Sequence, residues 1–149
     1  MTSFLDILLP VLTSTLEQPT SMGPHPPKVV RRVVTLAPSL TETVVALGAG
    51  ERLVGVSRFD DLPDVANLPR VGGFADPSVE AVIALKPDLL LVQPAPGNQR
   101  PVEKMAELGV PVLALPMHTV AQVQASMAAI GHELGLATEA EKLNLALTT

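Results

Sequence analysis

Cysteine, tryptophan and tyrosine are all absent from this chain of 149 residues. Without cysteine there can be no disulfide, no thiolate metal site, no cysteine nucleophile and no lipidated cysteine. The absence fits an oxidising compartment and a reducing one equally well, so it excludes chemistries but not a location.

Aromatic residues make up only 2% of the chain, all of them Phe, so Val, Leu and Ala must build the core. Charged residues are also few, at 17%, and the net charge is −5. Binding of nucleic acid is disfavoured, because phosphate recognition needs clustered Lys and Arg and base stacking needs aromatic rings. We therefore expect no nucleic-acid partner.

Long apolar runs are missing too, since none reaches the roughly 18 residues that a membrane-spanning helix needs. The first 18 residues contain a short apolar stretch, but Asp6 interrupts it. The stretch has no basic residues at its start and no small-residue cleavage site, so it fits the pattern of a signal peptide poorly. A degenerate or wrongly started leader, a short amphipathic helix and a vector-side extension are the alternatives.

The length predicts one domain, which can bury roughly 70% of its unfolded surface. Residues 19–28 are rich in Pro and Gly and are typical of a linker. We therefore predict an N-terminal extension and linker over residues 1–30, an α/β lobe over 31–137, and the start of a further helix over 138–149.

Four short apolar runs are predicted as buried strands: residues 33–36, 53–56, 89–92 and 112–115. Helix signals alternate with them. Ser39 and Glu42 have the spacing of a capping box, residues 76–78 open a second helix, and 100–108 and 119–134 have helical patterns. A second capping box begins at Thr138. This alternation predicts an α/β fold with a mostly parallel sheet. Ligands of such sheets bind beyond the carboxyl ends of the strands, which makes the loops after the strands the candidate functional edge.

Catalytic and metal-binding signals are weak. Ser39 follows a strand and opens a helix, but the G-x-S-x-G elbow is absent, so a helix cap is the preferred interpretation. His118 also follows a strand, and a small α/β enzyme using Ser39, His118 and a loop Asp is an alternative. Asp60, Asp61 and nearby acids lack calcium-loop spacing, and no phosphate-binding motif is present. We expect no catalytic residues, no metal site and no cofactor.

Two of the Phe are more informative. Phe59 and Phe74 lie in polar loops rich in Gly and Pro, away from any apolar periodicity. An apolar ring in a loop near the sheet edge favours a recognition surface for a flat or apolar ligand. A minor loop-packing cluster is the competing interpretation.

Three blocks of sequence resemble one known family in order and in register: RVVTLAPSLTE at residues 32–42, LVGVSRFDDLP at 53–63, and LPRVGGFADPSVEAVIALKPDLLLV at 68–92. Together they are similar to the N-terminal lobe of the binding proteins that serve ABC importers of ferric siderophores, haem and cobalamin. The resemblance extends from about residue 31 to the end of the chain.

The resemblance implies a Rossmann-like lobe with helices on both faces of the sheet, one half of a bilobal, non-enzymatic binder. By position, the ligand-binding residues are Pro38, Ser39, Phe59, Phe74 and Gln93. The implied ligand is a metal chelate, with a ferric siderophore or cobalamin preferred. Haem-binding relatives have Tyr at the position of Phe74, and a phenyl ring cannot ligate iron.

Glu80 matches the carboxylate with which this family docks on its membrane permease. The implied partners are therefore an ABC permease at the membrane surface and a small-molecule chelate, and the implied location is periplasmic or otherwise extracytoplasmic. The second lobe of the family is absent and the interlobe helix has barely begun at residue 138. A stand-alone interaction module, a homodimer of the truncated lobe, is a further alternative that sedimentation would test.

Overall fold

The computed structural model describes residues 17–147, so the predicted leader lies outside the described residues. The strands are β1 (Thr20–Met22), β2 (Val33–Thr35), β3 (Leu53–Gly55), β4 (Leu89–Val92) and β5 (Val112–Ala114). The α-helices are α2 (Pro38–Ala46), α3 (Val79–Ala84), α4 (Gln99–Glu107), α5 (Val120–Leu134) and α6 (Ala137–Leu147). Short 3-10 helices span Gly50–Arg52 and Pro63–Val65.

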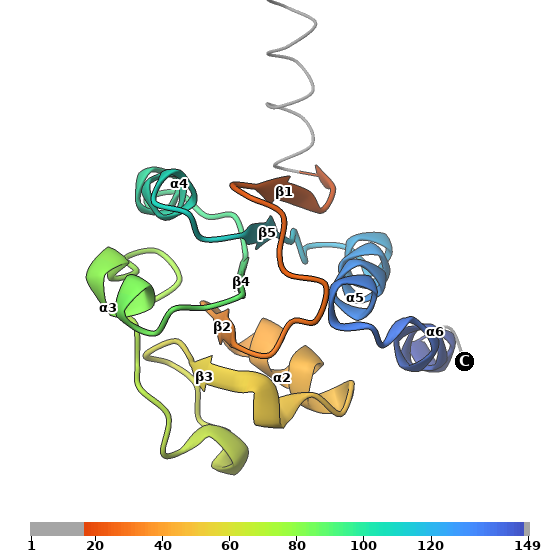
Figure 1. The fold of residues 1–149 in the computed structure, drawn as a ribbon. Coiled ribbons are helices and arrows are strands. Elements are labelled where there is room, and N and C mark those ends of the chain that lie inside the picture. Colours follow the sequence, from red (N-terminus) through yellow and green to blue (C-terminus); the bar gives the residue numbers. More distant parts are fainter. Residues whose placement is uncertain (1–16, 148–149) are drawn as a thin grey trace, which may run out of the picture.

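The strands form one sheet in the order β1-β5-β4-β2-β3 (Figure 1). β2, β3, β4 and β5 pair in parallel, and β1 alone pairs antiparallel, against β5. The four strands predicted from apolar runs are thus present and mutually parallel, each within one residue of its predicted end. The predicted α/β fold class is confirmed.

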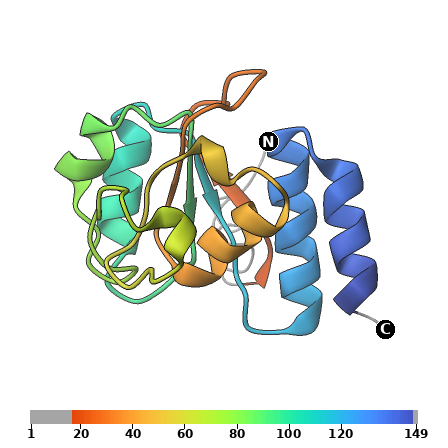
Figure 2. The same ribbon diagram turned by 90° about the horizontal axis from the view of Figure 1, so that it is seen from below.

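Helices cover both faces of the sheet, with α3 and α4 on one side and α2, α5 and α6 on the other (Figures 1 and 2). β4 shows why. Leu89 and Leu91 pack in the cluster that contains the core residues of α2 and α5, whereas Leu90 and Val92 pack with those of α3 and α4. Because successive side chains of a strand point to opposite faces, a continuous apolar run buries both.

The core is aliphatic, as the composition predicts. Its largest fully buried side chains are Leu, Ile, Val and one Met, whereas Phe59 and Phe74 are 58% and 41% exposed. Burying one Leu or Val completely is worth about 1.5–3 kcal/mol, so a core of this kind needs no aromatic ring. α6 lies so close to α5 that Gly131 has no room for a Cβ against Ala140.

Three local predictions are wrong. The capping box predicted to begin at Thr138 is one of them, because α6 already begins at Ala137 and Thr138 lies within the helix. Ser39 is not the cap of α2: Ala37 holds that position with extended backbone and gives no side-chain cap, and Ser39 lies within the helix. The predicted linker over residues 19–28 contains strand β1, whose Ser21 pairs with Leu113. That partner is far away in the sequence, so composition alone could not reveal it.

The caps of two other helices are well defined. Ser78 caps α3 by accepting a hydrogen bond from the Ala81 amide, and Thr119 caps α5 in a capping box with Gln122. Among the helices of residues 17–147, none has both the length and the apolar character required to cross a bilayer.

Candidate functional site

The loops after β2 and β4 diverge at a switch point in the sheet. β2 and β4 are neighbours, but α2 after β2 packs on one face and α4 after β4 packs on the other. Open α/β sheets bind ligands in the crevice that such divergence creates. Ser39 of α2 and Gln93 after β4 meet there, with the Ser39 hydroxyl 3.3 Å from Gln93 Oε1. Pro38, half-buried, precedes Ser39 on the same turn.

Phe59 lies in the loop after β3, which is held by a compact polar turn. The buried Asp60 carboxylate accepts hydrogen bonds through Oδ2 from the Ser57 amide (2.9 Å) and the Ser57 hydroxyl (2.5 Å). This turn directs Arg58 and Phe59 outward, where both are exposed. The Arg58 guanidinium lies 5.7 Å from the centroid of the Phe59 ring, within the range of a cation–π contact.

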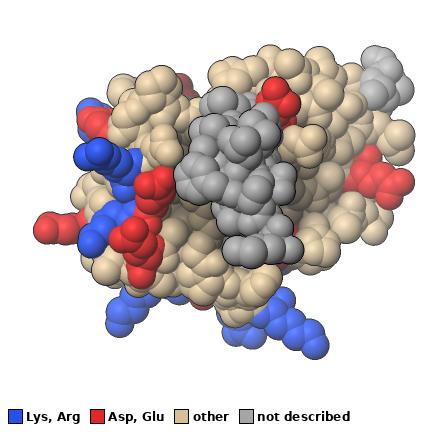
Figure 3. Space-filling view, turned by 90° about the horizontal axis from the view of Figure 1, so that it is seen from above, with Lys and Arg blue, Asp and Glu red and all other residues tan. Residues whose placement is uncertain are grey.

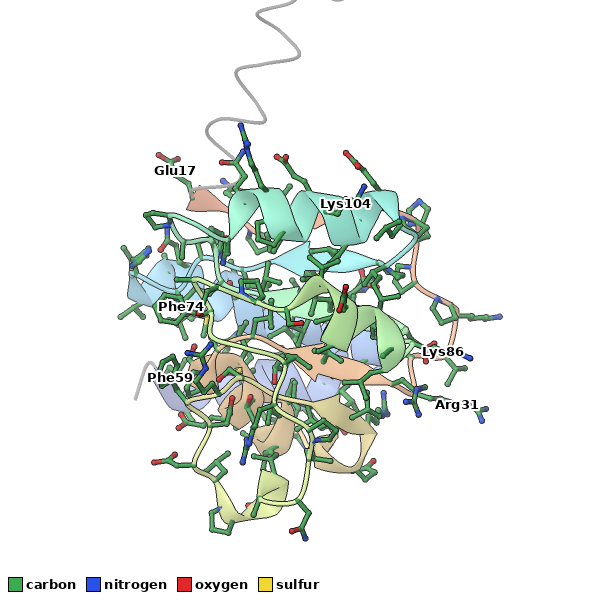
Figure 4. All side chains as sticks on the ribbon, turned by 90° about the vertical axis from the view of Figure 1, so that its left-hand side faces the viewer. Glu17, Arg31, Phe59, Phe74, Lys86 and Lys104 are labelled. Carbon is green, nitrogen blue, oxygen red and sulfur yellow. The ribbon has the colours of Figure 1, made fainter. Side chains whose placement is uncertain are left out.

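Phe74 lies in the following loop, and that loop touches the first. A Cβ added to Gly73 would approach Phe59 Cε2 to 3.1 Å, so the Phe59 ring packs against the backbone beside Phe74. Gly72 has φ of +100°, which favours glycine at that turn. The ion pair of Arg58 and Asp76 (3.0 Å) also joins the two loops. Figure 4 shows Phe59 and Phe74 at one edge of the molecule, with Arg31 and Lys86 at the opposite edge.

Asn98 links the Phe74 loop to the loop after β4. Asn98 is 3% exposed, and its side-chain amide nitrogen donates to the carbonyl oxygens of Phe74 (2.8 Å) and Gln93 (2.9 Å). Sequence reasoning missed both Asn98 and Arg58. An Asn before a helical pattern resembles an ordinary N-cap, and an Arg in a polar loop resembles a solvated charge, so neither residue had a usable signal.

Glu80 lies in the first turn of α3 and is exposed. β4 begins at the amino edge of the sheet soon after α3 ends, so the first turn of α3 faces the carboxyl edge, where the Phe loops lie. In the described part of the chain no ion pair is formed by Glu80. Its carboxylate is therefore accessible to a partner at the edge that carries the candidate ligand residues.

The enzyme alternative needs Ser39 and His118 within hydrogen-bonding distance. The Ser39 hydroxyl is directed to Gln93, and the hydrogen bond formed by His118 comes from its backbone amide to Gln122. Within residues 17–147 no hydrogen bond joins Ser39 to His118. The same residues contain no group of three or more His, Asp or Glu arranged to hold a metal ion.

Other surfaces differ from this edge. A cavity of about 390 Å³ lies between α5 and α6, lined by residues that include Gln124 and Asn144. None of the predicted ligand residues lines it. Charged side chains of both signs are interspersed on the side of α3 and α4 (Figure 3), where α4 exposes Arg100, Glu103, Lys104 and Glu107.

Sequence and structure comparisons with known proteins agree on one family. The sequence profile of the periplasmic binding protein family matches residues 33–147. The vitamin B12-binding protein of Yersinia pestis strain Pestoides F is 41% identical over 88 residues, which cover 58% of this chain and 31% of that protein.

Solved structures show the same likeness. A periplasmic heme-binding protein from Pseudomonas aeruginosa superposes with a TM-score of 0.76 at 30% identity, covering 80% of this chain and 44% of that one. The periplasmic vitamin B12-binding protein of Vibrio cholerae superposes with a TM-score of 0.71 at 30% identity, covering 78% of this chain and 46% of that one. The chain therefore spans less than half the length of these relatives.

These findings define an α/β lobe of the kind found in periplasmic binding proteins, and the chain belongs to the periplasmic binding protein family. The family resemblance seen in the sequence is confirmed.

Proposed function

We propose that this chain provides one wall of the ligand cleft in the substrate-binding component of an ABC importer. The component binds a metal-chelate nutrient and delivers it to the permease, without bond chemistry. The observation that carries the proposal is the pair of exposed rings, Phe59 and Phe74, on touching loops beside the switch point of the sheet. Exposed rings bury apolar area readily when a ligand covers them.

A ferric siderophore or cobalamin is the preferred ligand class. The three similar proteins described above are named for vitamin B12 and heme, which are both large, partly apolar metal chelates. Phe74 has no oxygen with which to ligate iron, so axial ligation of haem from this position is disfavoured. Phe59, Phe74, Pro38, Ser39 and Gln93 form the wall, with two apolar rings beside a small polar cluster.

Glu80 is the proposed docking carboxylate for the permease, because it is exposed beside the same edge. An exposed carboxylate on a helix contributes to the rate of encounter and to register more than to raw affinity. Delivery to a permease places the protein at the outer surface of the cytoplasmic membrane, and an extracytoplasmic location follows from the periplasmic relatives.

A single wall should bind weakly. Drug-sized ligands usually bury about 70–90% of their surface in a site, and one lobe can cover only one side. We therefore expect these 149 residues to bind a chelate far more weakly than a two-lobed member of the family does.

Calorimetric titration of the full-length gene product with cyanocobalamin and a panel of ferric siderophores tests the proposal. We expect saturable heat from at least one chelate, weakened when Phe59 and Phe74 are both replaced by Ala. Leu108→Ala is the matched control, since Leu108 is 54% exposed but lies at the end of α4 nearer the amino edge. Absence of heat from every chelate would overturn the proposed function.

That this lobe forms a homodimer by itself remains a prediction. Sedimentation of the chain at high concentration decides it, because a clean monomer contradicts a stable dimer.

A further inference from the structure

Asn98 occupies the N-cap position of α4 but does not cap that helix. Its backbone carbonyl accepts from the Val102 amide, as expected of a cap residue, yet its side chain forms no hydrogen bond to the first turn of α4. Asn is among the preferred N-cap residues because its side-chain oxygen usually satisfies a free helix amide. Here the side chain is directed into the loops that bear the candidate ligand residues.

The hydrogen-bonding groups of Asn98 match what surrounds them. Nδ2 donates to Phe74 O at 2.8 Å and to Gln93 O at 2.9 Å, and Oδ1 accepts from the Ala95 amide at 3.3 Å. A primary amide supplies two N–H donors and a carbonyl acceptor in one plane. Asp has the shape but no donors when ionised, so it cannot replace the amide there.

A second contact shows that the two loops are pressed together. Gly97 has φ of +93°, and a Cβ added to it would lie 3.1 Å from the Ala75 carbonyl oxygen. The loop after β4 therefore approaches the backbone next to Phe74 at two successive residues, Gly97 and Asn98. Gln93 in turn contacts Ser39, so the chain of contacts extends from Phe74 through Asn98 and Gln93 to Ser39.

We infer that Asn98 is a positioning residue, which fixes the Phe74 ring relative to the Ser39–Gln93 contact and so sets the shape of the ligand-binding wall. This inference rests on the proposed function for its consequence in ligand binding. The reason is physical: Phe74 is 41% exposed and belongs to a loop with little apolar burial of its own. A buried amide that satisfies two carbonyls from separate loops fixes their separation, because releasing either carbonyl leaves a buried polar group unpaired.

The test reads the position of Phe74 without any ligand. The full chain is labelled with fluorophenylalanine, which reports only Phe4, Phe59 and Phe74, and the Phe74 resonance is assigned with Phe74→Leu. In Asn98→Asp the two donors are lost and a carboxylate faces two carbonyl oxygens. We expect the Phe74 resonance to shift or broaden more than that of Phe59. A Phe74 resonance that keeps its wild-type position would overturn the inference.

Asn144→Asp is the matched control. Asn144 on α6 also donates its amide to a backbone carbonyl, that of Gln124 at 2.9 Å, but α6 lies on the face of the sheet opposite to α3, the helix that follows the Phe74 loop (Figure 1). We expect it to leave the Phe74 resonance unchanged, and a shift as large as that of Asn98→Asp would show a merely global effect and overturn the inference. Should Asn98→Asp fail to fold, Asn98→Ala removes the donors without adding charge and is judged by the same readout.

Titration with cyanocobalamin adds a functional measurement. In the full-length gene product we expect Asn98→Asp to raise the dissociation constant by about tenfold or more, and Asn144→Asp to leave it unchanged. An unchanged constant for Asn98→Asp counts against the inference. If the wild-type protein binds no chelate, the proposed function fails, and the fluorine resonance alone decides the role of Asn98.

Discussion

The guanidinium of Arg58 and the carboxylate of Asp76 lie 3.0 Å apart, between Nη2 and Oδ2, and connect the two loops that carry Phe59 and Phe74. Both side chains are more than half exposed, at 54% and 67%. Solvent screens such a pair, so its contribution to folding should be small even though it joins the two loops of the proposed ligand wall.

Arg58→Ala and Asp76→Ala, singly and together, measure that contribution. We expect each change to lower the free energy of unfolding by about 0–1 kcal/mol, with a coupling energy below about 1 kcal/mol that falls as salt is added. Urea denaturation of the four proteins of the cycle gives the values. A coupling energy above about 2 kcal/mol would show a buried, rigid bridge instead of an exposed one.

Gly72→Ala should destabilise the chain more than Gly109→Ala. Both glycines have φ of +100°, so both substitutions bear the same conformational cost, about 1–2 kcal/mol. Gly109 has nothing within 4 Å of an added Cβ, whereas at Gly72 the Cβ would meet the Asp76 carbonyl oxygen at 2.8 Å. Overpacking costs about 1–3 kcal/mol more, and only Gly72→Ala should bear that cost. The free energies of unfolding of the two variants, measured with denaturant, should therefore differ by the cost of crowding the tight turn beside Phe74. Equal losses would contradict the close approach.

Phe74→Tyr should create an iron ligand that the native chain lacks. A phenol can ionise and bind ferric iron, whereas the phenyl ring of Phe74 cannot. With added hemin, we expect a tyrosinate-to-iron charge-transfer band in the visible spectrum of Phe74→Tyr only. Phe59→Tyr is the matched control, because it introduces the same phenol on the neighbouring loop. The native chain has no Tyr, so absence of the band from Phe74→Tyr, or an equally strong band in Phe59→Tyr, would contradict the prediction.

Glu80→Gln should separate docking from ligand binding. The change removes the exposed charge at the start of α3 and nearly preserves shape. We expect an unchanged dissociation constant for the chelate but several-fold lower stimulation of permease ATPase activity in proteoliposomes, most strongly at low salt. Glu107→Gln, on the last turn of α4, is the control and should leave stimulation unchanged. Equal effects of the two variants would mean that only net charge is being sensed.

Much of the fold could be predicted from the sequence because its signals are local. Residues 89–92 form a continuous apolar run, and the structure buries alternate side chains on both faces of the sheet. The helical patterns predicted over 100–108 and 119–134 agree with α4 and α5 to within one residue at each end, and each helix is followed by a glycine with positive φ, Gly109 and Gly135. Ser39 was misassigned because S-x-x-E describes a local bond, whereas the actual partner of Ser39, Gln93, lies 54 residues away.

Only part of the candidate site could be predicted from the sequence. Phe59 and Phe74 were noticeable because apolar rings in polar loops break the expected pattern. Asn98 and Arg58 could not be found in this way, since their importance depends on which loops fold against each other. Strand β1 could not be predicted for the same reason, because it forms its hydrogen bonds with β5, which is distant in the sequence.

The sequence by itself determined the α/β class, the aliphatic core and the family, because the spacing of apolar residues and the three blocks of sequence are properties of the linear chain. The tertiary structure alone decided that Ser39 faces Gln93, that Arg58 pairs with Asp76, and that Asn98 joins the Phe74 loop to the loop after β4. The physical reason is that a hydrogen bond or ion pair requires its two groups within about 3 Å. In the sheet, β2 lies between β3 and β4, so the chain must pass across β2 to go from β3 to β4. This connection, and the close approach of the loops at the carboxyl edge, bring these distant residues within hydrogen-bonding distance.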